Sequence, residues 1–390
     1  MKNVKYVLGL AMATLTLGNI YGCNINQKQH QNTALVTKSI VEKPSKQYVK
    51  IALLLDTSNS MDGLINQAKA QLWDIVNEFT HAKCENATRP LLQIALYEYG
   101  NDNLSANEGY IRQVIGFSND LDEISEKLFS LTTNGGEEYC GQVIQTSLKQ
   151  LEWGKNADDL KMIFIAGNEP FTQGKLNYQD AAYNAKENDV IVNTIFCGNY
   201  NQGISTKWKN GALMTGGEYM AIDHNRQVVH IDTPYDDIII KLNGQLNNTY
   251  ISYGSIGREK KAAQAMQDSN AAELEEAVAV KRAVSKSSRL YKNSKWDLVD
   301  AIEDDEAVVS ELKQDDLPSE LKGKSEKEIK EYIIAKKSER VKIQKQIQEL
   351  NKKREAYIAK NQKEEAGELE NAMLSAIKAQ ASKKNYKWDN

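Results

Sequence analysis

Short apolar runs alternate with amphipathic segments between residue 48 and about residue 246. Residues 48–55 form a continuous apolar run ended by polar turn residues, which is typical of a strand buried on both faces. Comparable runs predict further strands at residues 91–99, 110–117, 161–166, 190–196 and 219–222. Apolar residues at helical spacing predict helices at residues 63–81, 122–131, 141–151, 178–188, 204–214 and 234–246. This alternation favours an α/β fold, in which helices cover both faces of a mostly parallel, doubly wound sheet.

The character of the sequence changes after residue 250. Residues 251–390 are rich in Lys, Glu, Ala and Gln, which predicts a charged, mainly α-helical, coiled-coil-like tail. Positions spaced by four and three residues form a heptad pattern at Ile329, Ile333, Lys336, Arg340, Ile343, Ile347, Leu350, Arg354 and Tyr357. Charged residues interrupt this seam, so two interpretations stay open: a helix that packs on its own protein, and a coiled coil with a partner.

Residues 1–23 resemble the signal peptide of a bacterial lipoprotein. Two lysines precede an apolar stretch, residues 7–17, which is too short to span a bilayer. Cys23 follows where a lipidated cysteine would become the new N-terminus, although Tyr21 occupies a position that is usually small. An ordinary secretory signal with a chance cysteine is the alternative.

The N-terminal lipid predicts a membrane-attached protein of the bacterial cell envelope, either facing the periplasm or in the outer membrane. Residues 24–46 are polar and lack periodicity, so they predict a flexible tether. The chain therefore divides into a signal peptide at 1–23, a tether at 24–46, an α/β domain at 47–250 and a helical tail at 251–390.

Composition excludes several classes of function. The formal net charge is −4, so no basic field attracts nucleic acid. The 4 histidines are scattered without zinc spacing, and no nucleophile elbow, phosphate-binding loop or metalloprotease motif occurs. We therefore predict that the protein is not an enzyme.

The segment that carries candidate chemistry begins at the end of the first predicted strand. Asp56, Ser58 and Ser60 lie on one tight loop between this strand and the following helix. A carboxylate and two hydroxyls supply only oxygen ligands, which Mg²⁺ and Ca²⁺ prefer. Capping of the helix by the same side chains is the alternative. Ligands of parallel α/β sheets bind beyond the carboxyl ends of the strands, where this loop lies.

The Asp56-x-Ser58-x-Ser60 loop resembles the first loop of the metal-ion-dependent adhesion site in the von Willebrand factor A (VWA) family. The order of predicted strands and helices from residue 48 to about residue 246 is similar as well. The resemblance implies a six-stranded sheet with one antiparallel edge. It also implies a divalent cation, Mg²⁺ or Ca²⁺, that keeps one coordination position open for an acidic side chain of a protein partner.

The second and third loops depart from the commoner pattern of that family. In the second loop, the resemblance implies Glu137 as the metal ligand, with Thr133 as the second choice. In the third loop, Gly167 occupies the position of the usual aspartate, so Asn168 or Glu169 would supply the missing oxygen, directly or through water. The loss of a carboxylate weakens binding of a hard cation, and a metal-free fold is the alternative.

Three cysteines remain beyond the signal peptide: Cys84, Cys140 and Cys197. The helix after Asp56 runs away from the metal end, so Cys84 should lie at the opposite pole. Cys140 and Cys197 both follow from loops at the metal end. If a disulfide forms, we expect it between Cys140 and Cys197, whose Cα atoms would have to lie within about 7 Å.

These observations favour an envelope-anchored VWA module that captures a protein partner through a divalent cation. The alternative is a structural or scaffolding protein that acts through its helical tail, with possible self-association and an inert VWA fold. A hydrolase that activates water at the metal ranks last, because no general base is identifiable.

Overall fold

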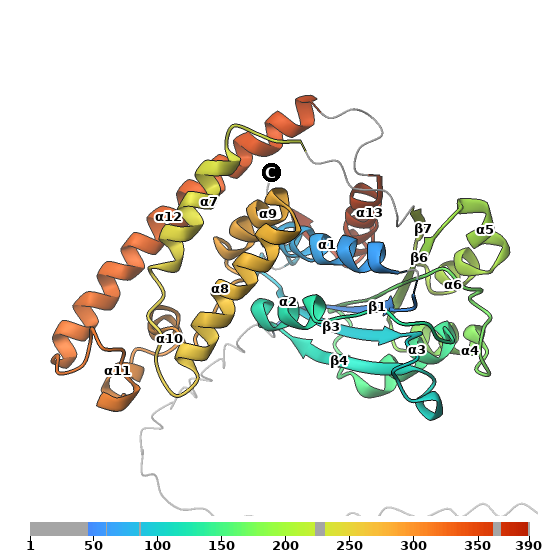
Figure 1. Cartoon of the computed structure of the whole chain (residues 1–390), viewed down its shortest axis with the longest axis horizontal. Coiled ribbons are helices and arrows are strands. Elements are labelled where there is room, and N and C mark those ends of the chain that lie inside the picture. The colour runs from blue at the N-terminus through green and yellow to red at the C-terminus, as the bar shows by residue number, and fades with distance from the viewer. Residues whose placement is uncertain (1–45, 60, 86, 223–230, 362–367, 389–390) are drawn as a thin grey trace, which may run out of the picture. The chain divides into compact units, whose positions relative to one another are not determined.

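In the computed structural model, six strands form one sheet in the order β4-β3-β1-β5-β6-β7 (Figure 1). The strands are β1 (Tyr48–Asp56), β3 (Leu91–Tyr99), β4 (Ile111–Ser118), β5 (Leu160–Gly167), β6 (Ile191–Cys197) and β7 (Tyr219–Ile222). Only β4 is antiparallel to its neighbour in this sheet. The predicted fold class, a mostly parallel six-stranded sheet followed by a helical C-terminal region, is confirmed. The structure describes residues 46–59, 61–85, 87–222, 231–361 and 368–388.

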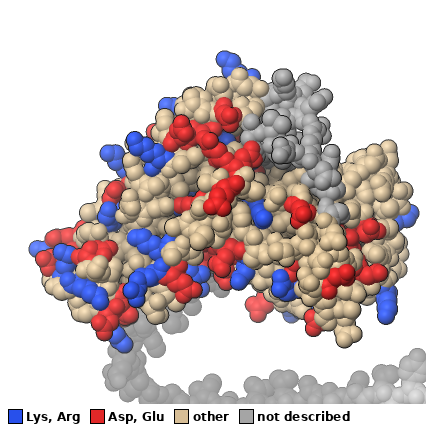
Figure 2. Space-filling view, in the orientation of Figure 1, with Lys and Arg blue, Asp and Glu red and all other residues tan. Residues whose placement is uncertain are grey.

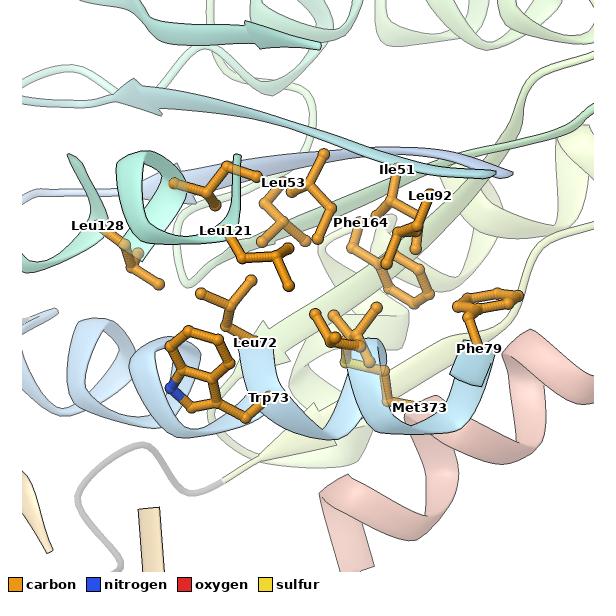
Figure 3. Packing of buried hydrophobic residues seen from close by; sticks show 14 of the residues in the cluster. Ile51, Leu53, Leu72, Trp73, Phe79, Leu92, Leu121, Leu128, Phe164 and Met373 are labelled. Atoms are coloured by element: carbon orange, nitrogen blue, oxygen red, sulfur yellow. The ribbon is translucent and has the colours of Figure 1, made fainter. Parts of the chain in front are cut away.

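The central strands are apolar throughout because helices cover both faces of the sheet. In β1, Ile51 and Leu53 point into one core cluster, whereas Ala52 and Leu54 point into the other. Side chains alternate along a strand, so a strand buried on both faces needs apolar residues at every position. Figure 3 shows the first cluster, in which Leu72 of α1 faces these β1 side chains.

Helices α1 (Asp62–Thr80) and α2 (Leu121–Phe129) lie on the face of the first cluster. The other face is covered by α3 (Cys140–Gln150), α4 (Tyr178–Glu187) and α6 (Trp208–Thr215). The single helix predicted at residues 204–214 is two helices, α5 (Tyr200–Ser205) and α6. Lys207, between them, has a φ of 76°, a left-handed conformation that interrupts helical hydrogen bonding.

The C-terminal region is helical and packs on the same side of the sheet as α1. Its elements are α7 (Asp236–Asn247), α8 (Gly257–Leu274), α9 (Glu276–Lys286), α10 (Leu298–Asp304), α11 (Val308–Glu311), α12 (Glu326–Asn361) and α13 (Glu368–Ser382). Met373 and Ile377 of α13 belong to the same buried cluster as Ile51 and Leu53 of β1. Close to the C-terminus, β8 (Lys387–Trp388) pairs with β2 (Ala82–Lys83). The helical region therefore completes the hydrophobic core of the sheet.

Buried ion pairs join the helical region to α2. Arg282 of α9 is 1% exposed and donates to Asp122 of α2 at 2.8 Å and to Asp268 of α8 at 2.7 Å. Lys286 of α9 also donates to Asp268, at 2.7 Å. Because a buried charge without its partner is costly, this network fixes where the helices sit on the sheet domain.

The heptad seam of α12 faces its own protein. Arg340 donates to both Asp297 and Asp300 at 2.7 and 2.8 Å, and Arg354 donates to Asp236 at 2.9 Å. Figure 1 shows α7 alongside α12. The charged residues that interrupt the seam thus have buried partners within the chain, as expected of a helix that packs on its own protein.

The predicted signal peptide, Cys23 and all but the last residue of the tether lie outside the described residues. In the part of the chain that the structure describes, no helix has both the length and the apolar character needed to cross a membrane.

Candidate functional site

The loop after β1 begins the candidate site. Asp56 is fully buried at the carboxyl end of β1, and its Oδ1 accepts a hydrogen bond from the backbone N–H of Ser58 at 2.8 Å. The backbone of Thr57 is held from two sides, by Tyr99 of β3 and by Asn134 of the loop before α3. These bonds bring the three loops that follow β1, β3 and α2 together at one point.

Glu138 is the second carboxylate of the site. Its side chain is 4% exposed and lies against the carboxyl group of Asp56 and the hydroxyl of Ser58. Glu137, the residue implied by the family resemblance, is exposed, and its Oε2 accepts from Gln173 at 3.5 Å. Adjacent residues of an extended segment point in opposite directions, so only one of the two glutamates can face inward.

Three buried oxygens converge without saturating donors. Asp56 Oδ2, Ser58 Oγ and Glu138 Oε2 are all inaccessible to solvent, and none makes a hydrogen bond of ordinary geometry to the rest of the described chain. Buried polar atoms are almost always hydrogen-bonded in native proteins. Three such exceptions at one point indicate a place built for a further group.

The electrostatics of the carboxyl pair follow from burial. Burial raises the pKa of Asp56, and burial together with the neighbouring Asp56 raises the pKa of Glu138 to about 10. The nearby charge of Glu169 raises both pKa values further. Two desolvated carboxylates cannot both ionise without a compensating cation, so the pair shares a proton at neutral pH when no cation is bound.

Glycines allow the loops to approach the carboxyl pair. A Cβ on Gly100 would lie 2.7 Å from Glu138 Cγ and 2.9 Å from Asp56 Oδ1, and its φ of +79° also favours glycine. A Cβ on Gly136 would lie 2.5 Å from the carbonyl oxygen of Gly100. Side chains at these positions would push Glu138 away from Asp56.

Comparison with known proteins agrees with this geometry. Residues 50–206 match the family model of the von Willebrand factor type A domain. This segment is a VWA domain. A search of curated proteins gave no match.

Several solved structures are similar to the VWA domain at low identity. BatB from Bacteroides thetaiotaomicron is 14% identical, with 45% of this chain and 90% of that chain covered and a TM-score of 0.34. Proximal thread matrix protein 1 from the mussel byssus, with a zinc-occupied MIDAS motif, is 11% identical; the match covers 46% of this chain and 43% of that one, with a TM-score of 0.34. The pilus adhesin SpaC from Lactobacillus rhamnosus GG is 14% identical, with 46% and 28% covered and a TM-score of 0.33. The match thus spans less than half of the latter two proteins.

Tyr99 accounts for the glycine in the third loop of this VWA domain. A Cβ on Gly167 would lie 2.5 Å from the Tyr99 hydroxyl oxygen and 3.1 Å from Asp56 Oδ2. The buried hydroxyl of Tyr99 donates to the carbonyl of Ala166 at 2.9 Å. An aspartate at position 167 would therefore overlap the tyrosine, and the site is left with two inward carboxylates.

The other predicted ligands are not drawn into this cluster. Thr133 donates its hydroxyl to Asp62 at 2.6 Å, Asn168 is half-buried, and Glu169 is exposed at the rim. Ser60 lies outside the described residues. Among the described residues, no three His, Cys, Asp or Glu side chains form a ready-made metal cluster.

The predicted Cys140–Cys197 disulfide is not present in the structure, where Cys84, Cys140 and Cys197 are free, buried thiols. Cys140 belongs to the core cluster on the α3 face of the sheet, and Cys197 to the cluster on the α1 face. The sheet therefore separates the two thiols, although both lie near its carboxyl edge. Burial raises the pKa of both thiols, so both are protonated and unreactive at neutral pH.

The donor set fits a hard divalent cation. It offers two carboxylates and one hydroxyl, all oxygen, from two loops, and the two carboxylates balance the charge of one dication. Oxygen donors suit Mg²⁺ or Ca²⁺ better than a soft ion.

Proposed function

We propose that the VWA domain captures a protein partner through a divalent cation, Mg²⁺ or Ca²⁺, bound by Asp56, Ser58 and Glu138. The observation that carries the proposal is the convergence of three buried oxygens that lack saturating donors. A dication would supply the missing positive charge and replace the proton that the two carboxyl groups share.

In this proposal the chain's own residues form the closed side of the site. Asp56 is oriented by the backbone N–H of Ser58, and Gly100 lets Glu138 pack against Asp56. Side-chain groups of the protein occupy few positions around the ion, so a partner's carboxylate can complete its coordination. We infer a binding module rather than an enzyme, because the residues at the site hold a ligand and none is arranged as a general base.

We further propose that the protein is held at the bacterial cell envelope by a lipid on Cys23. The apolar stretch and the position of the cysteine in the sequence support this placement. Mass spectrometry of the membrane fraction tests it, because lipidation adds a diacylglyceryl mass to the mature N-terminal peptide. An unmodified Cys23 peptide, or an N-terminus elsewhere, would refute lipid anchoring.

Thermal unfolding with and without ions tests the cation site. Mg²⁺ or Ca²⁺ at 100 times its Kd should stabilise the wild-type protein by about 2.7 kcal/mol relative to EDTA, since only the folded state has the site. Asp56→Ala and Ser58→Ala should lose most of this shift, whereas Glu137→Gln should retain it. Equal shifts in the wild type and Asp56→Ala would place ion binding elsewhere.

One observation favours a second function for the helical region. On α12, the side chains of Ile334 and Val341 are 64% and 53% exposed. They are seven residues apart and therefore lie on one face of the helix, away from the buried seam. A scaffolding role through self-association would use this face.

A further inference from the structure

Exposed carboxylates from four loops lie around the candidate cation site. Each loop contributes one: Asp62, Asp102, Glu137 and Glu169. The corresponding loop sequences, residues 57–63, 100–110, 132–139 and 167–174, contain no Lys or Arg. We call these four residues the acidic rim.

The acidic rim is tied to the loops that hold the buried oxygens. Asp62 accepts from Thr133 at 2.6 Å, and the Asp102 carboxylate lies 3.7 Å from the Cβ position of Gly135 in the same loop. Glu169 is close enough for its charge to act on both Asp56 and Glu138. Figure 2 shows acidic side chains over α3, close to the carboxyl ends of the strands. The rim thus lies around an opening that has Asp56 and Glu138 at its base.

Charge balance at this opening limits the partner. Two inward carboxylates neutralise one dication, so the loaded site has no excess positive charge to offset the rim. An isolated acidic side chain would approach four like charges, and like-charge juxtaposition disfavours a complex. A segment in which basic residues flank the acidic one avoids this repulsion, because each basic side chain can meet a rim carboxylate.

We propose that the partner segment carries Lys or Arg beside the carboxylate that completes the coordination of the cation. The proposal rests on the proposed function of the site. It adds the chemical class of the partner: a protein segment of mixed charge with an acidic centre and basic flanks.

Three capped, fluorescent peptides test the proposal on the full chain in Mg²⁺ and in EDTA. Their sequences are Gly-Lys-Gly-Asp-Gly-Lys-Gly, Gly-Glu-Gly-Asp-Gly-Glu-Gly and Gly-Lys-Gly-Asn-Gly-Lys-Gly. In low salt with Mg²⁺, the Lys-flanked Asp peptide should bind at least about tenfold more tightly than the Glu-flanked one, measured by fluorescence anisotropy. The Asn peptide should lose the Mg²⁺-dependent part of binding. At about 1 M salt the preference should shrink to about twofold, because exposed charges are screened.

A matched pair of variants assigns the effect to the rim. The triple variant Asp102→Asn, Glu137→Gln, Glu169→Gln should lose most of the preference for Lys flanks. The triple variant Glu306→Gln, Glu311→Gln, Asp315→Asn removes the same charge from exposed positions around α11 and should keep it.

Parallel unfolding experiments in Mg²⁺ and EDTA separate the two proposals. If Mg²⁺ stabilises the protein but the Lys-flanked Asp peptide binds no better than the Glu-flanked one, or neither binds, the mixed-charge partner is refuted and the cation site stands. An equal loss of preference in both triple variants also refutes it. If Mg²⁺ leaves the unfolding midpoint unchanged, the proposed function itself fails.

Discussion

Replacing Glu138 with glutamine should stabilise the metal-free protein and remove its response to divalent ions. Glu138 is 4% exposed, and burial together with the adjacent Asp56 raises its pKa to about 10 from an ordinary value of 4.5. At pH 7 the folded, metal-free protein therefore keeps a proton on the carboxyl pair that the unfolded chain releases. Glutamine has nearly the same shape, is neutral and can donate a hydrogen bond to Asp56.

The magnitude follows from the pKa difference between the folded and unfolded states. Neutral pH lies about 2.5 pH units above the unfolded value of 4.5, and each unit corresponds to about 1.4 kcal/mol, so retention of the proton costs the folded protein up to about 3 kcal/mol. Because the folded-state pKa is raised, this cost is absent below pH 4.5 and grows as the pH rises towards the folded-state value. Glu138→Gln should therefore be more stable than the wild type by about 2–3 kcal/mol at pH 7 and by about 1 kcal/mol at pH 5.

Urea unfolding in EDTA at pH 5 and pH 7 measures both differences. The control is Glu137→Gln, which changes an exposed side chain and should stay within about 0.5 kcal/mol of the wild type at both pH values. In Mg²⁺, Glu137→Gln should gain stability as the wild type does, and Glu138→Gln should not. A Glu138→Gln variant that is less stable than the wild type at pH 7 in EDTA, or that differs from it equally at both pH values, would refute the reasoning.

Three further substitutions test the packing around the site and the helical region. Gly100→Ala should lower the free energy of unfolding by roughly 2–4 kcal/mol and abolish the Mg²⁺ shift, since its Cβ would meet Glu138 and Asp56 in a left-handed backbone; a normal Mg²⁺ shift would contradict this. Arg282→Met should cost roughly 3–5 kcal/mol in urea unfolding, because Asp122 and Asp268 lose a buried partner; a cost below about 1 kcal/mol would show that the network is dispensable. The double variant Ile334→Glu, Val341→Glu should leave stability within about 1 kcal/mol. If α12 mediates self-association, sedimentation velocity should show fewer oligomers for this variant, and an unchanged distribution would exclude this face.

The sheet and the first loop could be predicted from the sequence because their signals are local. A continuous apolar run such as residues 48–55 suits only a strand covered on both faces, and a polar loop directly after it must lie at the carboxyl edge. These two facts placed Asp56 and Ser58 where the structure has them.

The choice between Glu137 and Glu138 could not be made from the sequence. It depends on which of two adjacent side chains faces Asp56, and that direction is set by the approach of Gly100 from β3. The pairing of Cys140 with Cys197 failed for a similar reason. Cys197 follows Phe196 in β6, and the two side chains point to opposite faces, so a single position decides which cluster the thiol joins.

The packing of the helical region depends on contacts that are distant in sequence. Arg340 and Arg354 interrupt the heptad seam of α12, and in isolation they read as defects of a coiled coil. Their partners Asp297, Asp300 and Asp236 lie 40 to 118 residues away along the chain. No local pattern shows such pairs, so the sequence leaves the partner of the seam open.

Calorimetric titration of the metal-free protein at pH 7 tests the central claim most directly. Repeating the titration in buffers of different ionisation enthalpy counts the protons released when Mg²⁺ or Ca²⁺ binds. The account predicts one binding site with release of about one proton, the one shared by Asp56 and Glu138, and loss of the site in Asp56→Ala. Binding without proton release, or binding that Asp56→Ala leaves unchanged, would contradict the claim that these buried oxygens form the cation site.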